Sequence, residues 1–251
     1  NSEVLFVAVG ESGTILTSLD GITWTSRTSG TTEELRRVIY GNSTFVIVGS
    51  SGTIFTSSDG TTWTSRTSGT TNTLFGFTYG NNTFVTVGRS KTILTSSNGT
   101  TWTSVTQSFS NPPTFYGVAY GDSTFVMVGS SIVFTSSDRT TWTARSDGTS
   151  KYFVDVNYGN STFVAVGESG TIITSPDGIT WTSRTSNVTN ELQRVNYGNN
   201  TIVTVGTSGT IITSPDGITW TSRTSGTSNL LKDITYKNGI FVVVGQSGSI
   251  L

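Results

Sequence analysis

The sequence has 251 residues, of which 12% are charged, and its formal net charge is −1. No run of basic residues occurs, so we expect no nucleic-acid partner. Cysteine and histidine are both absent, which excludes disulfides, thiol nucleophiles and the usual soft metal ligands. We therefore expect no metal and no cofactor. No apolar stretch approaches about 18 residues, so we also expect no insertion into a membrane.

A repeat of about forty residues runs through the chain. Tryptophan recurs every 39 or 40 residues, and each one ends a similar phrase. The six phrases are TSLDGITW, TSSDGTTW, TSSNGTTW, TSSDRTTW, TSPDGITW and TSPDGITW. A tyrosine also occupies one fixed place in each repeat, at Tyr40, Tyr79, Tyr120, Tyr158, Tyr197 and Tyr236.

Each repeat predicts four short strands, because runs of β-branched and aromatic residues are separated by Gly, Asn, Asp and Ser turns. The second repeat supplies them as RRVIYG, TFVIVG, GTIFTS and TWTSRT. Alternation in the second run puts Phe45 and Ile47 on one face, and Val46 and Val48 on the other. A sheet with two apolar faces must be covered on both sides. Radial stacking of four-stranded antiparallel blades in an all-β propeller does this, while a solenoid is the alternative.

We expect residues 1–251 to form a single propeller domain. Its repeats cover residues 1–30, 31–69, 70–109, 110–148, 149–187, 188–226 and 227–251. Residues 5–16 resemble residues 240–251, so the chain carries six first, seven second, seven third and six fourth strands. We expect seven blades, with six as the close alternative, and terminal blades that are incomplete or closed by both chain ends.

The repeated phrase S-x-D-G-x-T-W resembles the Asp-box of BNR (sialidase-like) repeat β-propellers, although Asp and Gly are adjacent here. The resemblance implies a turn between the third and fourth strands, with a structural Asp and an aromatic residue packed between blades. The fourth phrase has Arg139 in place of Gly, and Asn98 replaces Asp in the third. Since Asn98 would weaken a calcium site, we favour a structural turn over a ligand site. The matching residues are Asp20, Asp59, Asn98, Asp138, Asp177 and Asp216, with Trp24, Trp63, Trp102, Trp142, Trp181 and Trp220.

Catalysis requires an asymmetric set of residues, and this chain is nearly periodic. A sialidase-like hydrolase would need an arginine cluster, a tyrosine nucleophile with a glutamate partner, and an acid. The arginines instead repeat on the fourth strand, where they are typical of edge protection, and the tyrosines repeat at one position. We therefore expect that the protein is not an enzyme and has no catalytic residues.

The positions where the repeats disagree are the loop after the second strand and the start of the first strand. In a meandering sheet both lie at the same end, so we expect a recognition surface there. Cross-blade pairing and neutral drift are the alternative explanations. The candidate ligand-binding residues are Arg37, Phe75, Arg89, Phe109, Tyr116, Tyr152, Asp155, Glu168, Arg194 and Asp233.

The leading functional hypothesis is a non-catalytic recognition module that binds a glycan or glycoconjugate through this variable surface. Aromatic faces and a few placed polar groups are typical of sugar sites. The alternative is a protein–protein interaction or assembly scaffold within a larger surface protein, and a glycoside hydrolase is the third possibility. We expect an extracellular or cell-surface location. The sequence does not indicate an oligomeric state.

Overall fold

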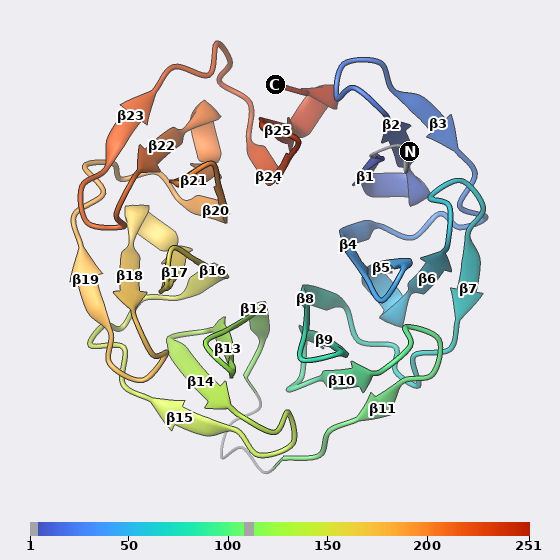
Figure 1. The fold of residues 1–251 in the computed structure, drawn as a ribbon, viewed down its shortest axis with the longest axis horizontal. Coiled ribbons are helices and arrows are strands. Elements are labelled where there is room, and N and C mark those ends of the chain that lie inside the picture. Colours follow the sequence, from blue (N-terminus) through green and yellow to red (C-terminus); the bar gives the residue numbers. More distant parts are fainter. Residues whose placement is uncertain (1–4, 108–112) are drawn as a thin grey trace. The chain divides into compact units, whose positions relative to one another are not determined.

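The computed structural model describes residues 5–107 and 113–251 of the chain. These divide into two compact units, which we call unit 1 (Asn1–Phe115) and unit 2 (Tyr116–Leu251). Every sheet is antiparallel, and its strands follow one another in chain order (Figure 1). The single-domain expectation for residues 1–251 stays a prediction.

Unit 1 contains one three-stranded and two four-stranded sheets. The first sheet consists of β1 (Phe6–Val9), β2 (Ile15–Ser18) and β3 (Thr25–Arg27). The second consists of β4 (Leu35–Gly41), β5 (Thr44–Gly49), β6 (Ile54–Ser57) and β7 (Thr64–Arg66). The third consists of β8 (Leu74–Gly80), β9 (Thr83–Gly88), β10 (Ile93–Ser96) and β11 (Thr103–Ser104).

Unit 2 contains three four-stranded sheets and a final two-stranded one. The first holds β12 (Phe115–Gly121), β13 (Thr124–Gly129), β14 (Ile132–Ser136) and β15 (Thr143–Arg145). The second holds β16 (Phe153–Gly159), β17 (Thr162–Gly167), β18 (Ile172–Ser175) and β19 (Thr182–Arg184). The third holds β20 (Leu192–Gly198), β21 (Thr201–Gly206), β22 (Ile211–Ser214) and β23 (Thr221–Arg223). The last holds β24 (Leu231–Lys237) and β25 (Ile240–Gly245).

The four-strand reading of each repeat is confirmed, because five of the sheets contain all four expected strands. The first sheet starts at a second strand, and the last ends with a single bridge between Val244 and Ile250 where a third strand was expected. Seven complete blades are therefore not formed by the described residues. The blade count itself stays a prediction.

Short 3-10 turns follow the second strand in five repeats. They are η1 (Glu11–Gly13), η2 (Ser50–Gly52), η3 (Glu168–Gly170), η4 (Thr207–Gly209) and η5 (Gln246–Gly248). The glycine of each turn has a positive φ, which is 70° at Gly170. A Cβ at Gly170 would also come within 2.0 Å of a backbone oxygen, so glycine is required on both counts.

Alternation along the second strand gives each inner sheet two apolar faces, as expected. In β5, Ile47 packs in a cluster with Ile15 of the sheet before it. Val46 and Val48 pack on the other face, in a cluster with Leu74 of the sheet after it. Burial of such a side chain contributes about 1.5–3 kcal/mol, so neighbouring repeats within a unit stabilise one another.

A tyrosine–glycine contact also joins successive sheets within each unit. A Cβ placed on Gly159 would lie 2.2 Å from the ring of Tyr197, the repeated tyrosine of the next sheet. Gly41, Gly121 and Gly198 meet the corresponding tyrosines in the same way. Tyr40 is 56% exposed, and within the described part of the chain the sheet before it contains no first strand that would supply the glycine.

Candidate recognition site

One end of each sheet is closed by the turn that contains the repeated Asp, and this turn satisfies its own polar groups. In the first repeat, Asp20 Oδ1 accepts hydrogen bonds from the backbone N–H groups of Ile22 and Thr23, at 2.8 and 2.7 Å. The Ser18 hydroxyl donates to the same oxygen at 2.9 Å. The same arrangement occurs around Asp59, Asn98, Asp138, Asp177 and Asp216.

The turn tryptophans are tied to the same network. The indole Nε1 of Trp24 donates to the Gly21 carbonyl oxygen at 3.1 Å, and the other five tryptophans make the equivalent bond. Trp142 and Trp220 are buried, and Trp63, Trp102 and Trp181 pack against the apolar clusters between sheets. Five of the six tryptophans therefore pack as the resemblance implies.

Backbone hydrogen bonds determine the acidity of these aspartates. The N–H groups of Thr23 and Ile22 lower the pKa of Asp20 to about 2, and equivalent bonds lower the pKa values of the other four aspartates. Asn98 makes both backbone bonds without a charge. Within residues 5–107 and 113–251, no group of three or more acidic side chains is arranged to hold a metal ion. The geometry supports the structural reading of the turn.

The fourth-strand arginines lie against their own sheets. Arg27 Nε donates to Thr17 Oγ1 on the third strand at 2.9 Å. Arg66, Arg145, Arg184 and Arg223 make the same bond to Thr56, Thr135, Thr174 and Thr213. These arginines are thus cross-strand links, one in each of five sheets, and not a cluster around a substrate carboxylate.

The opposite end of each sheet carries the variable residues, and we call this end the rim. The rim comprises residues 33–37, 50, 73–76 and 89–91 in unit 1, and residues 116, 151–155, 168, 191–194, 207, 230–233 and 246 in unit 2. Backbone bonds bring its two segments together: the N–H of Glu168 donates to the carbonyl oxygen of Tyr152 at 3.2 Å, and the N–H of Thr207 to that of Glu191 at 3.0 Å. The expectation that both variable segments lie at one end of the sheet is confirmed.

A glycine at the end of each second strand makes this close approach possible. A Cβ at Gly167 would lie 2.1 Å from the carbonyl oxygen of Tyr152, and one at Gly206 would lie 2.0 Å from that of Glu191. Any larger residue would push the loop away from the start of the first strand. The sequence signal for the rim is therefore the VG pair that ends the second strand.

A β-bulge at the start of the first strand leaves one residue outside the register of pairing with the second strand. In β4, Leu35 pairs with Gly49 and Arg37 pairs with Val48, so Arg36 has no partner in the register. The same register shift occurs at the equivalent residue in four other repeats. The bulge residues are Arg36, Phe75, Val154, Gln193 and Lys232, which differ in every repeat. Bulges commonly redirect a side chain in this way.

Unit 1 carries a basic aromatic cluster at its rim, which we define as Arg36, Phe75 and Arg89. The guanidinium carbons of Arg36 and Arg89 lie 4.9 and 5.8 Å from the centre of the Phe75 ring. Arg36 also forms a 2.6 Å ion pair with Glu34. Of the candidates predicted in this unit, Phe75 and Arg89 come together, and Arg36 joins them in place of the predicted Arg37.

Unit 2 carries an acidic aromatic cluster at its rim, which we define as Tyr116, Tyr152, Glu168 and Glu191. The rings of Tyr116 and Tyr152 lie 6.4 Å apart between centroids at 52°. Glu168 Oε1 accepts a hydrogen bond from the Tyr152 backbone N–H at 3.1 Å. The structure therefore brings together three of the predicted residues and adds Glu191, which the sequence analysis missed.

Tyr152 departs from the repeated tyrosines, which lie at the opposite end of the sheets. Burial and, after it, the hydrogen-bonded Glu191 carboxylate together raise the pKa of Tyr152 to about 12. A tyrosine with a glutamate partner belongs to the chemistry of sialidase-like nucleophiles, so this pair corrects the view that no tyrosine stands apart.

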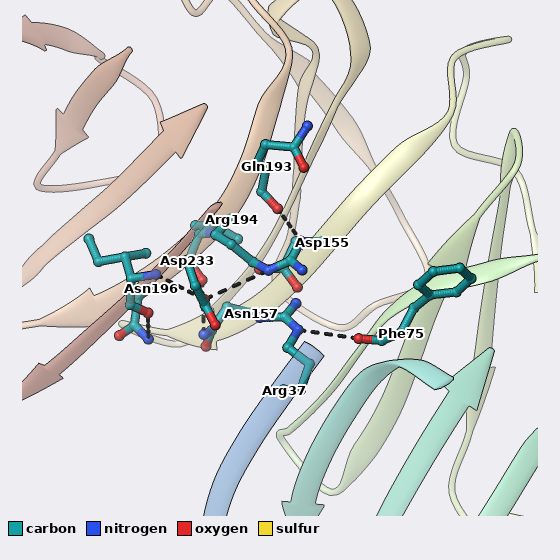
Figure 2. A network of polar contacts seen from close by, with 10 residues as sticks. Arg37, Phe75, Asp155, Asn157, Gln193, Arg194, Asn196 and Asp233 are labelled. Atoms are coloured by element: carbon teal, nitrogen blue, oxygen red, sulfur yellow. Dashed lines mark hydrogen bonds and ion pairs between the residues drawn. The ribbon is translucent and has the colours of Figure 1, made fainter. Parts of the chain in front are cut away.

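The remaining charged candidates make contacts between neighbouring first strands (Figure 2). The buried Asp155 of β16 accepts a hydrogen bond from the Val195 N–H of β20 at 3.0 Å. Arg194 of β20 lies 3.7 Å from Asp233 of β24, measured from Nε to Oδ1. In unit 1, Arg37 Nε donates to the Phe75 carbonyl oxygen at 3.3 Å. These contacts match the cross-blade alternative for all four residues.

Two further asparagines strengthen the links between first strands in unit 2. Asn157 Nδ2 donates to the Val195 carbonyl oxygen at 3.1 Å, and Asn196 Nδ2 donates to the Ile234 carbonyl oxygen at 3.2 Å (Figure 2). Equivalent positions thus bond to the next sheet in the same manner. Phe109, the last predicted candidate, lies outside the described residues.

An open groove lies within unit 1, and no residue of the two clusters lines it. It has a volume of about 980 Å³ and is lined mainly by backbone and by Ser and Thr hydroxyls. Trp63 and Arg66 also line it. None of the predicted ligand-binding residues contributes to this groove.

The repeated four-stranded antiparallel sheets define an all-β propeller, and the comparisons with solved structures bear out this class. No protein-family model and no curated protein matches the sequence. The chain resembles YCF48 bound to D1 peptide, with 18% identity, a TM-score of 0.79 and coverage of 99% of this chain and 89% of that one. YCF48 from Cyanidioschyzon merolae gives 16% identity, a TM-score of 0.76 and coverage of 97% and 89%.

A catalytically inactive variant of virginiamycin B lyase from Staphylococcus aureus, with quinupristin, gives 10% identity and a TM-score of 0.81 over 97% of this chain and 92% of that one. At these identities the similarities show the fold alone. The solenoid alternative is thereby excluded, and membership of the Asp-box family stays a resemblance. Among the described residues, none lies in a helix with the length and hydropathy to cross a membrane.

Proposed function

We propose that this chain is a non-catalytic module that binds a protein or peptide partner through the rim. The observation that carries the proposal is the contrast between the two ends of the sheets. The Asp turns use their polar groups internally, whereas the rim presents half-buried aromatic rings beside charged groups. Aromatic and arginine side chains of this kind are enriched where proteins bind one another.

The structural similarity to YCF48 supports the same choice. That protein was solved with a bound D1 peptide, so a propeller of similar fold accommodates a peptide. The two chains share 18% identity, so the similarity supports the proposal through the common fold and not through particular residues. Recognition by this chain depends on its own rim residues.

Peptide display on the intact chain tests the proposal. Selected peptides are expected to bind the wild type and to bind Phe75→Ala or Tyr152→Ala at least about tenfold more weakly, as for buried aromatic anchors. Tyr40→Ala is the matched control, because Tyr40 is an exposed aromatic at the Asp-turn end. Peptides that bind both rim variants as well as the wild type, or a failure to enrich any peptide, would overturn the proposal.

A glycan is the second candidate ligand, and the hydroxyl-lined groove of unit 1 supports it. Trp63 offers an aromatic face there, and Arg66 offers hydrogen-bond donors. A glycan array probed with the wild type and with Arg66→Ala tests this candidate. Binding that Arg66→Ala abolishes is the expected result, and an array without any binding at high protein concentration removes the glycan.

A further inference from the structure

The two rim clusters carry unbalanced charges of opposite sign. In the basic aromatic cluster, Glu34 neutralises Arg36, but the Arg89 side chain is exposed and makes no ion pair within the described residues. Lys91, on the same loop, adds a second exposed cation. The guanidinium carbon of Arg89 lies 5.8 Å from the centre of the Phe75 ring, within the range of a cation–π contact, and its hydrogen-bond donors stay available.

The acidic aromatic cluster has an excess of negative charge. Neither Glu168 nor Glu191 forms an ion pair with a cation in residues 5–107 or 113–251. Both carboxylates are half-buried beside Tyr152, whose phenol is neutral at pH 7 and does not offset their charge. The faces of Tyr116 and Tyr152 add a region of negative potential, since aromatic faces attract cations.

We propose that the basic aromatic cluster of one copy of this chain binds the acidic aromatic cluster of a second copy. Arginine suits this contact, because its planar guanidinium stacks on tyrosine and forms two parallel bonds to a carboxylate. This inference rests on the proposed role of the rim as a recognition surface. It adds that a second copy is one of the partners recognised there.

Charge and composition favour a second copy as the occupant. The two clusters are complementary in kind, with arginines on a phenylalanine facing glutamates beside tyrosines. Both occur at the rim ends of their sheets. The formal net charge of −1 leaves little long-range repulsion between copies. Because the contact depends on a few partly exposed charges, the association is weak and salt-dependent.

Charge reversal combined with sedimentation velocity tests the contact. The wild type is expected to self-associate with increasing concentration at low salt and to dissociate at about 0.5 M salt, where the screening length is a few ångström. Arg89→Glu and Glu168→Arg are each expected to weaken self-association at least about tenfold, because each places like charges opposite one another. An equimolar mixture of the two variants restores association, since each supplies the cluster that the other now requires. The double variant restores it as well.

Arg223→Glu is the matched control, because it reverses the charge of an exposed arginine on β23 that belongs to neither rim cluster. This variant is expected to leave self-association unchanged. Circular dichroism and thermal melting verify that every variant is folded. A wild type that stays monomeric at all concentrations, or an association that neither rim variant alters, overturns the inference. Failure to recover association in the mixture also overturns it. The proposed function is judged separately, because peptide display on monomeric protein reports binding to the rim whether or not copies associate.

Discussion

The two ends of the sheets differ in how they use the same kinds of residue. At the Asp-turn end, the Oδ1 atom of each Asp accepts two backbone N–H bonds and each indole N–H donates to a nearby carbonyl oxygen, so these groups are already bonded within the turn. At the rim, arginines and glutamates lie beside aromatic rings and are only partly paired. The comparison teaches that repetition in this chain serves the stability of the fold, and that the residues proposed for binding lie where the repetition breaks down.

The largest effect expected from this comparison is at the glycines that meet tyrosine rings. Gly159→Ala places a Cβ about 2.2 Å from the Tyr197 ring and is expected to destabilise the fold by about 1–3 kcal/mol, as overpacking does. Thermal denaturation measures the loss. Gly10→Ala is the control, because its Cβ would meet only Thr14 at an ordinary 3.8 Å. Equal melting temperatures for both variants would show that the tyrosine–glycine contact has no role in stability.

A smaller difference is expected between an Asp turn and the rim. Asp177→Ala leaves the N–H groups of Ile179 and Thr180 without their acceptor and lowers the melting temperature by about 2–4 °C. Gln193→Ala removes a rim side chain of similar exposure at the bulge of β20 and changes it by less than about 2 °C. If the rim variant melts lower than the turn variant, the division of roles between the two ends is wrong.

Asn98→Asp sharpens the comparison by making the third turn like the others. The new carboxylate accepts the same two backbone bonds, so its pKa is expected to fall below 3.8, as the pKa of Asp20 does to about 2. A lowered folded-state pKa stabilises the fold above the unfolded pKa, and this gain disappears as the pH falls from about 4 to about 2. Melting temperatures of the variant and wild type should therefore separate at neutral pH and converge near pH 2. A separation that persists at pH 2 would indicate another cause.

The smallest expected effect concerns the titration of the Tyr152 hydroxyl at the rim. Tyr152 holds its proton up to a pKa of about 12, against an ordinary value of 10.0. Because the raised pKa belongs to the folded state, the associated stability is lost as the pH rises from about 10 to about 12. Glu191→Gln should lower this pKa, as followed by the ultraviolet absorbance of the phenolate. Tyr152→Phe identifies the titrating group, and an unchanged titration in Glu191→Gln would exclude Glu191 as a cause.

The sequence predicts most of the fold, because its signals are local and are repeated. The phrase around Trp63 fixes a turn between two strands, and alternation in TFVIVG fixes two apolar faces, as the packing of Val46 and Ile47 confirms. The incomplete third strand near Ile250 differs from expectation because it is limited to one bridge.

The candidate site was predicted less well, since bulges and cross-sheet contacts are not local signals. Arg36 and Arg37 are adjacent and look equivalent in the sequence. Because of the bulge, the Arg36 guanidinium lies over the Phe75 ring, whereas Arg37 donates to a backbone carbonyl oxygen of the next sheet. Glu191 was missed because it lies 39 residues from Tyr152 and meets it only through the stacking of successive sheets.

The bulge at the start of each first strand has a consequence for how such a protein changes over time. A residue outside the hydrogen-bond register, such as Val154 or Lys232, can be exchanged without shifting any neighbouring pair. Duplication of one repeat therefore supplies a fresh position that accepts almost any side chain at little cost to folding. Randomising the bulge residues alone would give a library of binders on an unaltered framework.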